Sequence, residues 1–241
     1  MAKIFSAFAT KNLCYIAAQI MAPEGFVLHS TGANNPNLWR YVDKPDICGA
    51  NKYNNHYNMA QPLGPTGQPG KRCPHGFIGL DKNGEIRIAQ LLPWNYSCWG
   101  CGSGSKGSYN DNYIQIEICE DALANEKYFN EVFRAAAELC AQLAERYKFP
   151  VDNIVSHKEA HALGYASNHG DVEHWTSRFG KDMNWFRDEV RELMKPAENS
   201  KPADKSYFVV GTKVCKGTAA LTTAKNQLKA LGYEYTVMTA E

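Results

Sequence analysis

Two short apolar runs lie far apart in the chain, and each one ends on a histidine. The first run, Phe26–Leu28, leads into His29, and the second, which includes Val155, leads into His157. Apolar runs of this length, bounded by turn residues, predict buried β-strands. If the two strands are neighbours in one sheet, their ends bring the two imidazoles together. The alternative interpretation is that each histidine simply terminates a strand.

The second feature is a stretch dense in titratable side chains, residues 157–175, which holds four of the seven histidines of the chain. Histidine titrates near neutrality and is the commonest zinc ligand, so the stretch indicates a metal or acid–base site. A polar loop without a site is the alternative. His157 and His161 also have the i, i+4 spacing of a zincin helix, but that motif requires Glu after the first histidine, where this chain has Lys158.

Other segments predict the remaining secondary structure. Residues 76–80 and 85–93 predict a hairpin around an Asn-Gly turn. Residues 128–148 and 183–194 carry apolar side chains at helical spacing and predict amphipathic helices. Residues 43–75, rich in Pro, Gly and Asn, predict a long irregular connection, which is either a binding loop or a surface insertion.

Residues 112–121 predict a further strand with a carboxylate near its centre. Alternation places Ile114, Ile116 and Ile118 on one face and Glu117 on the other. Because a carboxylate in mid-strand is costly to bury unless it is paired or used, Glu117 is the foremost candidate site residue that is not a histidine. A solvent-facing glutamate is the alternative.

Composition narrows the class of protein. The 26 basic and 25 acidic residues give a net charge of +1, so nothing indicates a nucleic-acid partner or an anionic membrane surface. No apolar stretch approaches the length of a membrane span, and the N-terminus lacks the apolar core of a signal peptide. We therefore expect synthesis and folding in the cytoplasm, with release by another route if the protein acts outside. Among the eight cysteines, Cys98 and Cys101 form a C-x-x-C pair, for which free thiols, a disulfide and metal ligation all remain open.

The C-terminal part differs in composition from the rest. Residues 196–205 are polar and contain proline, which is typical of a linker. Residues 206–241 predict a strand, a helix and a strand, a unit too small to be stable alone. We expect this βαβ unit to dock, to dimerise or to form half of a larger fold.

The candidate residues are suited to one kind of chemistry. Two neutral imidazoles with one carboxylate or thiolate, and a water in the fourth position, make a catalytic zinc site. Zinc lowers the pKa of that water and polarises a carbonyl oxygen. A nearby carboxylate such as Glu117 can take the proton and return it to a leaving nitrogen.

Four motifs, taken in order, resemble the type 2 N-acetylmuramoyl-L-alanine amidases, the family of phage endolysins, bacterial autolysins and peptidoglycan recognition proteins. The resemblance covers about residues 12–194 and rests on Val27-Leu-His29-Ser-Thr-Gly-Ala-Asn-Asn-Pro, Pro93-Trp-Asn with Trp99-Gly-Cys-Gly-Ser-Gly, Ile114-Gln-Ile-Glu117-Ile-Cys-Glu-Asp and residues 157–175. It implies a mixed central β-sheet flanked by helices, an α/β fold with one Zn²⁺ in a groove. It also implies hydrolysis of the amide between N-acetylmuramic acid and the L-alanine of the stem peptide.

The resemblance assigns roles to particular residues. His29 and His157 match two zinc ligands, Asp171 matches the third, and Glu117 matches the general base. His169 stands where the family has a lysine that stabilises the oxyanion, and it must carry a proton to act as a cation. His75 matches a position that faces the groove and donates to the substrate.

Besides His169, the motifs depart from the family pattern at two places. Val172-Glu173 replaces Pro-Gly after the third ligand, so His169 is the alternative ligand, with Asp171 behind it; we favour Asp171. Gly100 stands where some relatives have a histidine. His161 and His174 are expected only to position the loop.

We therefore expect a zinc amidase domain at 1–195 that acts on peptidoglycan as a lysin, of a phage or prophage endolysin type. The unit at 206–241 resembles half of a sporulation-related repeat, which implies wall binding, and a homodimer through this unit is the alternative role. The rival functions are a muropeptide recognition protein without catalysis and a zinc peptidase of the stem peptide.

Overall fold

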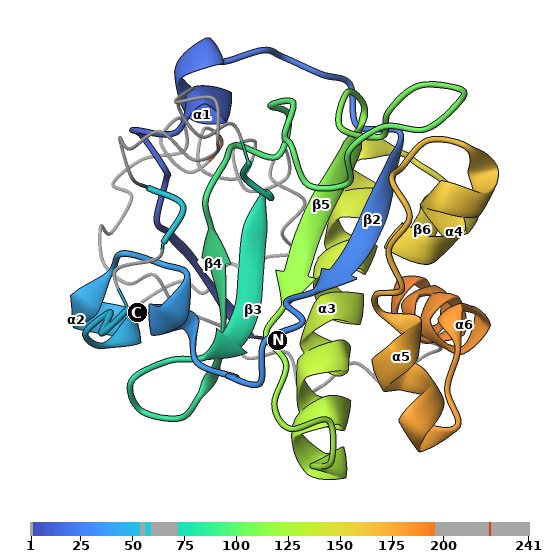
Figure 1. Ribbon diagram of the computed structural model, residues 1–241. Helices are drawn as coiled ribbons and strands as arrows, with labels where there is room; N and C mark the ends of the chain where they lie inside the picture. The colour runs from blue at the N-terminus through green and yellow to red at the C-terminus, as the bar shows by residue number, and fades with distance from the viewer. Residues whose placement is uncertain (1, 54–55, 59–71, 196–221, 223–241) are drawn as a thin grey trace. The chain divides into compact units, whose positions relative to one another are not determined.

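The computed structural model describes residues 2–53, 56–58, 72–195 and 222 (Figure 1). The chain divides into two compact units, Met1–Pro196 and Ala197–Glu241. The predicted linker at 196–205 and, apart from Thr222, the predicted βαβ unit at 206–241 lie outside the described residues. The fold below is that of the first unit.

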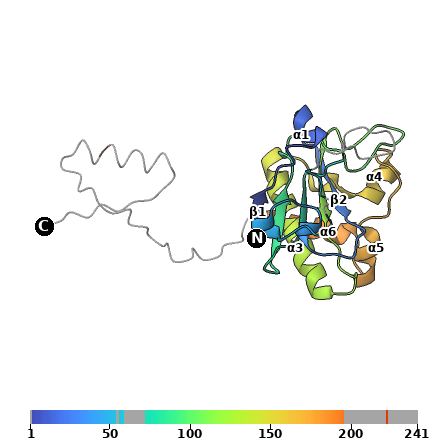
Figure 2. The ribbon, with the colours of Figure 1, turned by 60° about the vertical axis from the view of Figure 1, so that its left-hand side comes forward.

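The strands of the first unit form one mixed sheet. They are β1 (Lys3–Ser6), β2 (Gly25–Ser30), β3 (Gly76–Leu80), β4 (Ile86–Gln90), β5 (Tyr113–Ile118) and β6 (Ile154–Ser156). Their order across the sheet is β1-β4-β3-β5-β2-β6 (Figure 1). The hairpin β3–β4 is antiparallel, and every other neighbouring pair is parallel. Strand β1 forms one edge, as Figure 2 shows.

Helices accompany the sheet. They are α1 (Leu13–Ala17), α2 (Pro45–Cys48), α3 (Glu126–Tyr147), α4 (His157–Leu163), α5 (Glu173–Thr176) and α6 (Met183–Met194), with 3-10 turns at Leu38–Arg40, Val151–Asn153 and Ser177–Phe179. None of the helices in the described ranges is both long and apolar enough to cross a bilayer.

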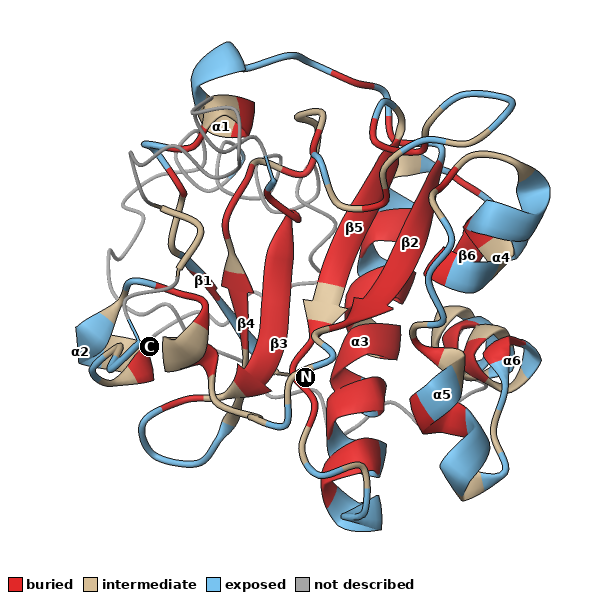
Figure 3. Ribbon diagram, viewed as in Figure 1, coloured by how far each residue is buried: buried red, intermediate tan, exposed pale blue. Residues whose placement is uncertain are grey.

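Because side chains alternate along each strand, the two faces of the sheet pack against different residues. Leu28 of β2, Ile78 of β3 and Ile116 of β5 belong to one buried cluster together with apolar residues of α3 and α6. The adjacent residues along the strands point to the opposite face, where Val27 and Phe77, each one position earlier, lie in two smaller clusters. Strand β2 is buried along its whole length (Figure 3). One face therefore holds the main core, and the other is free to carry a site.

The expected mixed sheet flanked by helices is confirmed. The hairpin forms as predicted, with Gly84 at a φ of +78° in its turn, and the helix at 183–194 matches α6. The helix predicted at 128–148 begins two residues earlier, because Asn125 caps it by accepting from the backbone N–H of Tyr128. His157 differs from the expectation of a strand end, since it is the first residue of α4.

Candidate metal centre and active site

The parallel register of three strands collects the main candidates at one edge of the sheet. His29 of β2 pairs directly with Glu117 of β5. On the other side of β2, Leu28 pairs with Ser156 of β6. His29 directly follows Leu28 and His157 directly follows Ser156, so the two histidines come next to each other beyond this pair. Because carboxyl ends of parallel strands lie at the same edge, residues 29, 117 and 157 meet there despite their distance in sequence.

The start of α4 fixes the place of His157. Ser156 caps the helix: its hydroxyl accepts from the backbone N–H of Glu159, and the Glu159 carboxylate accepts from the backbone N–H of Ser156. This reciprocal capping box holds the first helical turn. The guanidinium group of Arg187 in α6 donates hydrogen bonds to both carboxylate oxygens of Glu159, at 2.9 and 3.1 Å. The helix that carries His157 is thus anchored to the rest of the unit.

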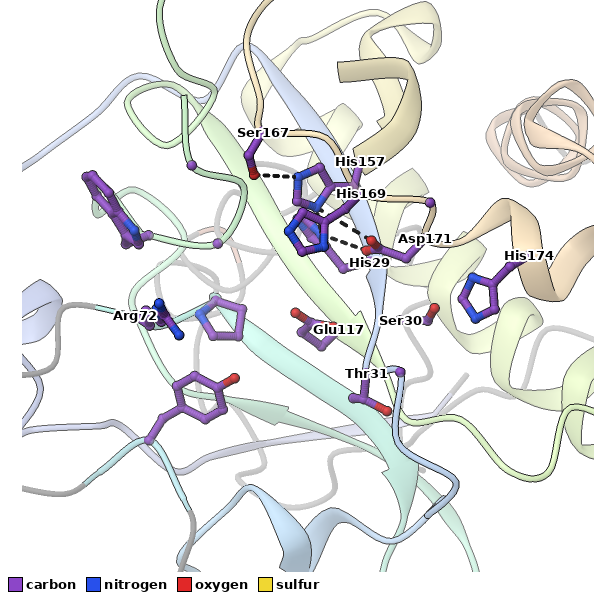
Figure 4. A pocket seen from close by; sticks show the side chains of 17 residues that line it. His29, Ser30, Thr31, Arg72, Glu117, His157, Ser167, His169, Asp171 and His174 are labelled. Carbon is purple, nitrogen blue, oxygen red and sulfur yellow. Dashed lines mark hydrogen bonds and ion pairs between the residues drawn. The ribbon is translucent and has the colours of Figure 1, made fainter. Parts of the chain in front are cut away.

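His29, His157 and Asp171 form a compact donor set (Figure 4). The His29 Nδ1 atom lies 3.1 Å from Asp171 Oδ2 and 3.1 Å from His157 Nδ1. His157 Nδ1 lies 3.7 Å from Asp171 Oδ1. One ligand atom from each residue lies within 4.8 Å of the others, and both histidines are buried. No other group of three such side chains in the described residues is placed to hold a metal ion.

The hydrogen bonds of His29 leave one of its ring nitrogens free to bind a cation. His29 Nε2 lies 3.0 Å from the side-chain oxygen of Gln115, which only accepts, so Nε2 carries the proton. In a neutral His29 the Nδ1 lone pair therefore faces the Asp171 carboxylate and the Nδ1 atom of His157. Electron pairs from three groups converge on one point, and a His₂Asp set of this kind is suited to zinc.

The electrostatics of the donor set also favour binding of a cation. Burial by itself lowers the pKa of His29, but the hydrogen bond to Asp171 and the charges of Glu117 and Asp171 raise that pKa above its ordinary value. Burial by itself raises the pKa of Asp171, yet hydrogen bonds with His157 and His29 hold it well below its usual range. Asp171 is thus a permanent carboxylate that draws a positive charge into the cluster.

Glu117 is the isolated carboxylate of the site. Its Oε2 atom is buried and has no hydrogen-bond partner. Burial, together with the nearby carboxylates of Asp171 and Glu120, raises the pKa of Glu117 to about 7, against the lowering effect of His29. A carboxylate with a free oxygen and a pKa near neutrality is suited to general base catalysis.

A cavity of about 810 Å³ opens over these residues (Figure 4). Its wall consists of the donor set, Glu117 and residues of several loops: Ser30, Thr31, Gly32, Tyr57, Arg72, Pro74, Trp99, Gly100, Gly102, Ser167, His169, Gly170 and His174. His169 is exposed on this wall, and its ring lies on the ring of His157 with 4.8 Å between the centroids. It therefore lies beside the donor set but outside it.

Three predicted histidines have other surroundings. His75, which we expected to face the groove, is fully buried outside the cavity wall. Its Nε2 atom donates to the carbonyl of Tyr96 and its Nδ1 atom accepts from the backbone N–H of Gln115, so it has no N–H left for a substrate. His161 Nδ1 lies 3.1 Å from the carbonyl oxygen of Ala166, and His174 Nε2 lies 2.9 Å from a carboxylate oxygen of Glu120. That His161 and His174 position the loop stays a prediction, and His174 also lines the cavity.

Some residues around the site were not predicted. Gln115 contacts His29 and Ser167 contacts His157, at 3.0 and 3.4 Å. The alternation that singled out Glu117 places Gln115 on the same face two residues earlier, and this signal could have identified it. For Ser167 no comparable pattern exists. Cys98 and Cys101 are both buried free thiols, so the described structure has no disulfide between them.

Comparisons with known proteins identify the family of the chain. Residues 19–173 match the family described as N-acetylmuramoyl-L-alanine amidase, and the chain belongs to this family. The N-acetylmuramoyl-L-alanine amidase CwlA of a Bacillus species is 26% identical over 153 residues, which are 60% of this chain and 57% of CwlA. The chain thus spans a little over half the length of that relative.

Solved structures share the fold. The hydrolase AmiA of Staphylococcus aureus, in complex with its ligand, superposes with a TM-score of 0.56 at 17% identity, over 80% of this chain and 84% of that chain. The catalytic domain of XlyA gives a TM-score of 0.51 at 20% identity, over 78% of this chain and 99% of that domain. At these identities the likeness establishes the architecture only.

Proposed function

We propose that the chain is a zinc-dependent N-acetylmuramoyl-L-alanine amidase that cleaves peptidoglycan. The observation that carries the proposal is the convergence of His29, His157 and Asp171 beside Glu117, whose Oε2 atom has no hydrogen-bond partner, on the wall of an open cavity. Membership of the amidase family supports the choice of substrate.

His29, His157 and Asp171 would hold the zinc ion in this proposal. A zinc ion supplies a Lewis acid that lowers the pKa of a bound water to about 7 and polarises the scissile carbonyl. Glu117 accepts the proton of the attacking water and gives it to the leaving nitrogen of L-alanine. Glu117 lines the cavity, and no protein group is hydrogen-bonded to its Oε2 atom, which supports this role.

His169 is the candidate for stabilising the oxyanion. Its ring is exposed on the cavity wall beside His157, where an N–H can reach a substrate oxygen. Asp171 rather than His169 serves as the third ligand, because its carboxylate lies within reach of both ligand histidines. His75 has no place in the mechanism, since both of its ring nitrogens are paired with backbone groups.

The remaining parts of the chain receive proposed roles consistent with a lysin. Residues 1–195 form the amidase domain, residues 196–205 link it to the C-terminal unit, and residues 206–241 bind the wall or form a homodimer. The protein acts on the cell wall after release of the phage or prophage type.

A wall-lysis assay tests the proposal against a recognition protein that does not cut. Purified protein should clear a suspension of Gram-positive walls, a chelator should stop clearing, and added zinc should restore it. Glu117→Gln is the matched control, because it retains the three ligands and removes the base. Intact walls with zinc-saturated wild-type protein would refute the enzymatic function.

A further inference from the structure

The glycine-rich loop at residues 100–110 touches the partners of both ligand histidines. Gln115 and Ser167 lie behind His29 and His157, and both side chains also contact Cys101 of this loop. We propose that this loop, through Gln115 and Ser167, fixes the ring tautomer and orientation of both histidines for metal binding. The inference rests on the proposed zinc site, which it extends to positioning residues outside the donor set.

Asn110 sets the orientation of the Gln115 amide. The Asn110 side-chain oxygen accepts from the backbone N–H groups of Gly100 and Cys101, at 2.9 and 3.1 Å, so that atom is an oxygen. The same oxygen accepts from Gln115 Nε2 at 3.0 Å. The other end of the amide, the oxygen, must then face His29 Nε2, which donates its proton to it. The Nδ1 lone pair of His29 is thereby left for the metal.

Ser167 acts on His157 in the same way. Its hydroxyl donates its single proton to the carbonyl of Cys101 at 3.0 Å, and its backbone N–H donates to the same carbonyl at 2.8 Å. The hydroxyl oxygen can then only accept from His157 Nε2, 3.4 Å away. Both ligand histidines are thus held by Nε2 and present Nδ1 to Asp171.

Two glycines of the loop make room for these side chains. A Cβ atom at Gly100 would lie 2.3 Å from the Gln115 side-chain oxygen, and one at Gly102 would lie 2.8 Å from the Ser167 hydroxyl. The absence of a side chain at both glycines of the Gly-Cys-Gly motif at 100–102 therefore leaves the space that the Gln115 amide and the Ser167 hydroxyl occupy. At Gly100 the obstructed atom is the end of a flexible side chain, so Gly100→Ala should displace the Gln115 amide rather than the loop.

Zinc affinity of the full-length protein, measured by competition with a chelating dye, tests the inference. Gln115→Leu removes the acceptor, and Gly100→Ala displaces it without altering any hydrogen-bonding side chain. Both should weaken zinc binding about 10- to 100-fold, the usual effect of losing a group that orients a ligand histidine. Ser167→Ala should weaken it by a smaller factor, because its contact with His157 is longer. Gln90→Leu is the matched control, since Gln90 is a strand glutamine whose side-chain amide donates to the Leu92 carbonyl and which does not line the cavity. This variant should bind zinc as wild type does.

A nitrogen-15 NMR spectrum of the zinc-loaded protein gives a second, spectroscopic readout. The Nε2–H of His29 should be protected from exchange in wild type and in Gln90→Leu, and should exchange rapidly in Gln115→Leu and Gly100→Ala. Wild-type zinc affinity in Gly100→Ala and Ser167→Ala, with the His29 Nε2–H still protected in Gly100→Ala, would overturn the inference, even if Gln115→Leu fails to fold. Failure of the wild-type protein to bind zinc would instead overturn the proposed function itself.

Discussion

Replacing Glu117 by Gln should change activity and stability in opposite directions. Glu117 is the base in the proposed mechanism, and its carboxylate is buried with one oxygen unpaired. Loss of a general base typically reduces turnover about 10²- to 10⁴-fold. Burial of the charge, however, works against the folded state, because the pKa of Glu117 rises from 4.5 to about 7 on folding.

The size of the stability effect follows from that shift. At about 1.4 kcal/mol for each pH unit, the rise corresponds to roughly 3 kcal/mol. The folded state holds the proton of Glu117 up to about pH 7, whereas the unfolded chain releases it near pH 4.5. Wild type should therefore lose about 3 kcal/mol relative to Glu117→Gln between pH 4.5 and 7, with no further change above pH 7. Any constant effect of the new amide group does not alter this pH dependence.

Urea unfolding of the zinc-free proteins at a series of pH values measures this difference. The zinc-free form is required because a bound cation would lower the pKa of Glu117. If the free energies of unfolding of wild type and Glu117→Gln change with pH in parallel, the raised pKa of the Glu117 carboxylate is refuted. If Glu117→Gln keeps turnover within tenfold of wild type, the role of Glu117 as base is refuted.

Further predictions concern the ligands, a buried histidine and the core. Asp171→Ala should abolish stoichiometric zinc binding, whereas His169→Ala should keep zinc and lose turnover; metal analysis showing the reverse would exchange their roles. Burial lowers the pKa of His75 to about 4, so its ring should stay neutral as pH falls through 6 and 5, which NMR titration of its ring protons can check. An ordinary titration near pH 6.5 would contradict the paired, buried ring. Trp175 is fully buried, and Trp175→Ala should destabilise the protein by about 3–5 kcal/mol in urea unfolding, while a loss below 1 kcal/mol would contradict its packing.

The sequence predicts those features that depend on local periodicity. Alternation in β5 separates Ile116 from Glu117 correctly, and helical spacing defines α3 and α6. Apolar runs ending on His29 and His157 predict their meeting, because both are placed by neighbouring strands. Each of these patterns lies within one segment of the sequence and indicates which face of that helix or strand is buried.

Features set by contacts between distant segments could not be predicted in the same way. Whether Asp171 or His169 is the third ligand depends on how the loop after α4 returns to β2, which no local pattern encodes. His75 illustrates the converse: it stands next to a strand in the expected motif, but its ring is turned into the sheet by Tyr96 and Gln115. The close approach of Gly100 to the Gln115 amide is likewise a contact between separate segments, which no local pattern encodes.

Mass spectrometry of a peptidoglycan digest tests the central claim most directly. Zinc-loaded protein should release stem peptides of full length with a free L-alanine amine, and a chelator should prevent their appearance. Shortened stem peptides would identify a peptidase instead, and an unchanged digest from zinc-saturated protein would contradict hydrolysis at this site.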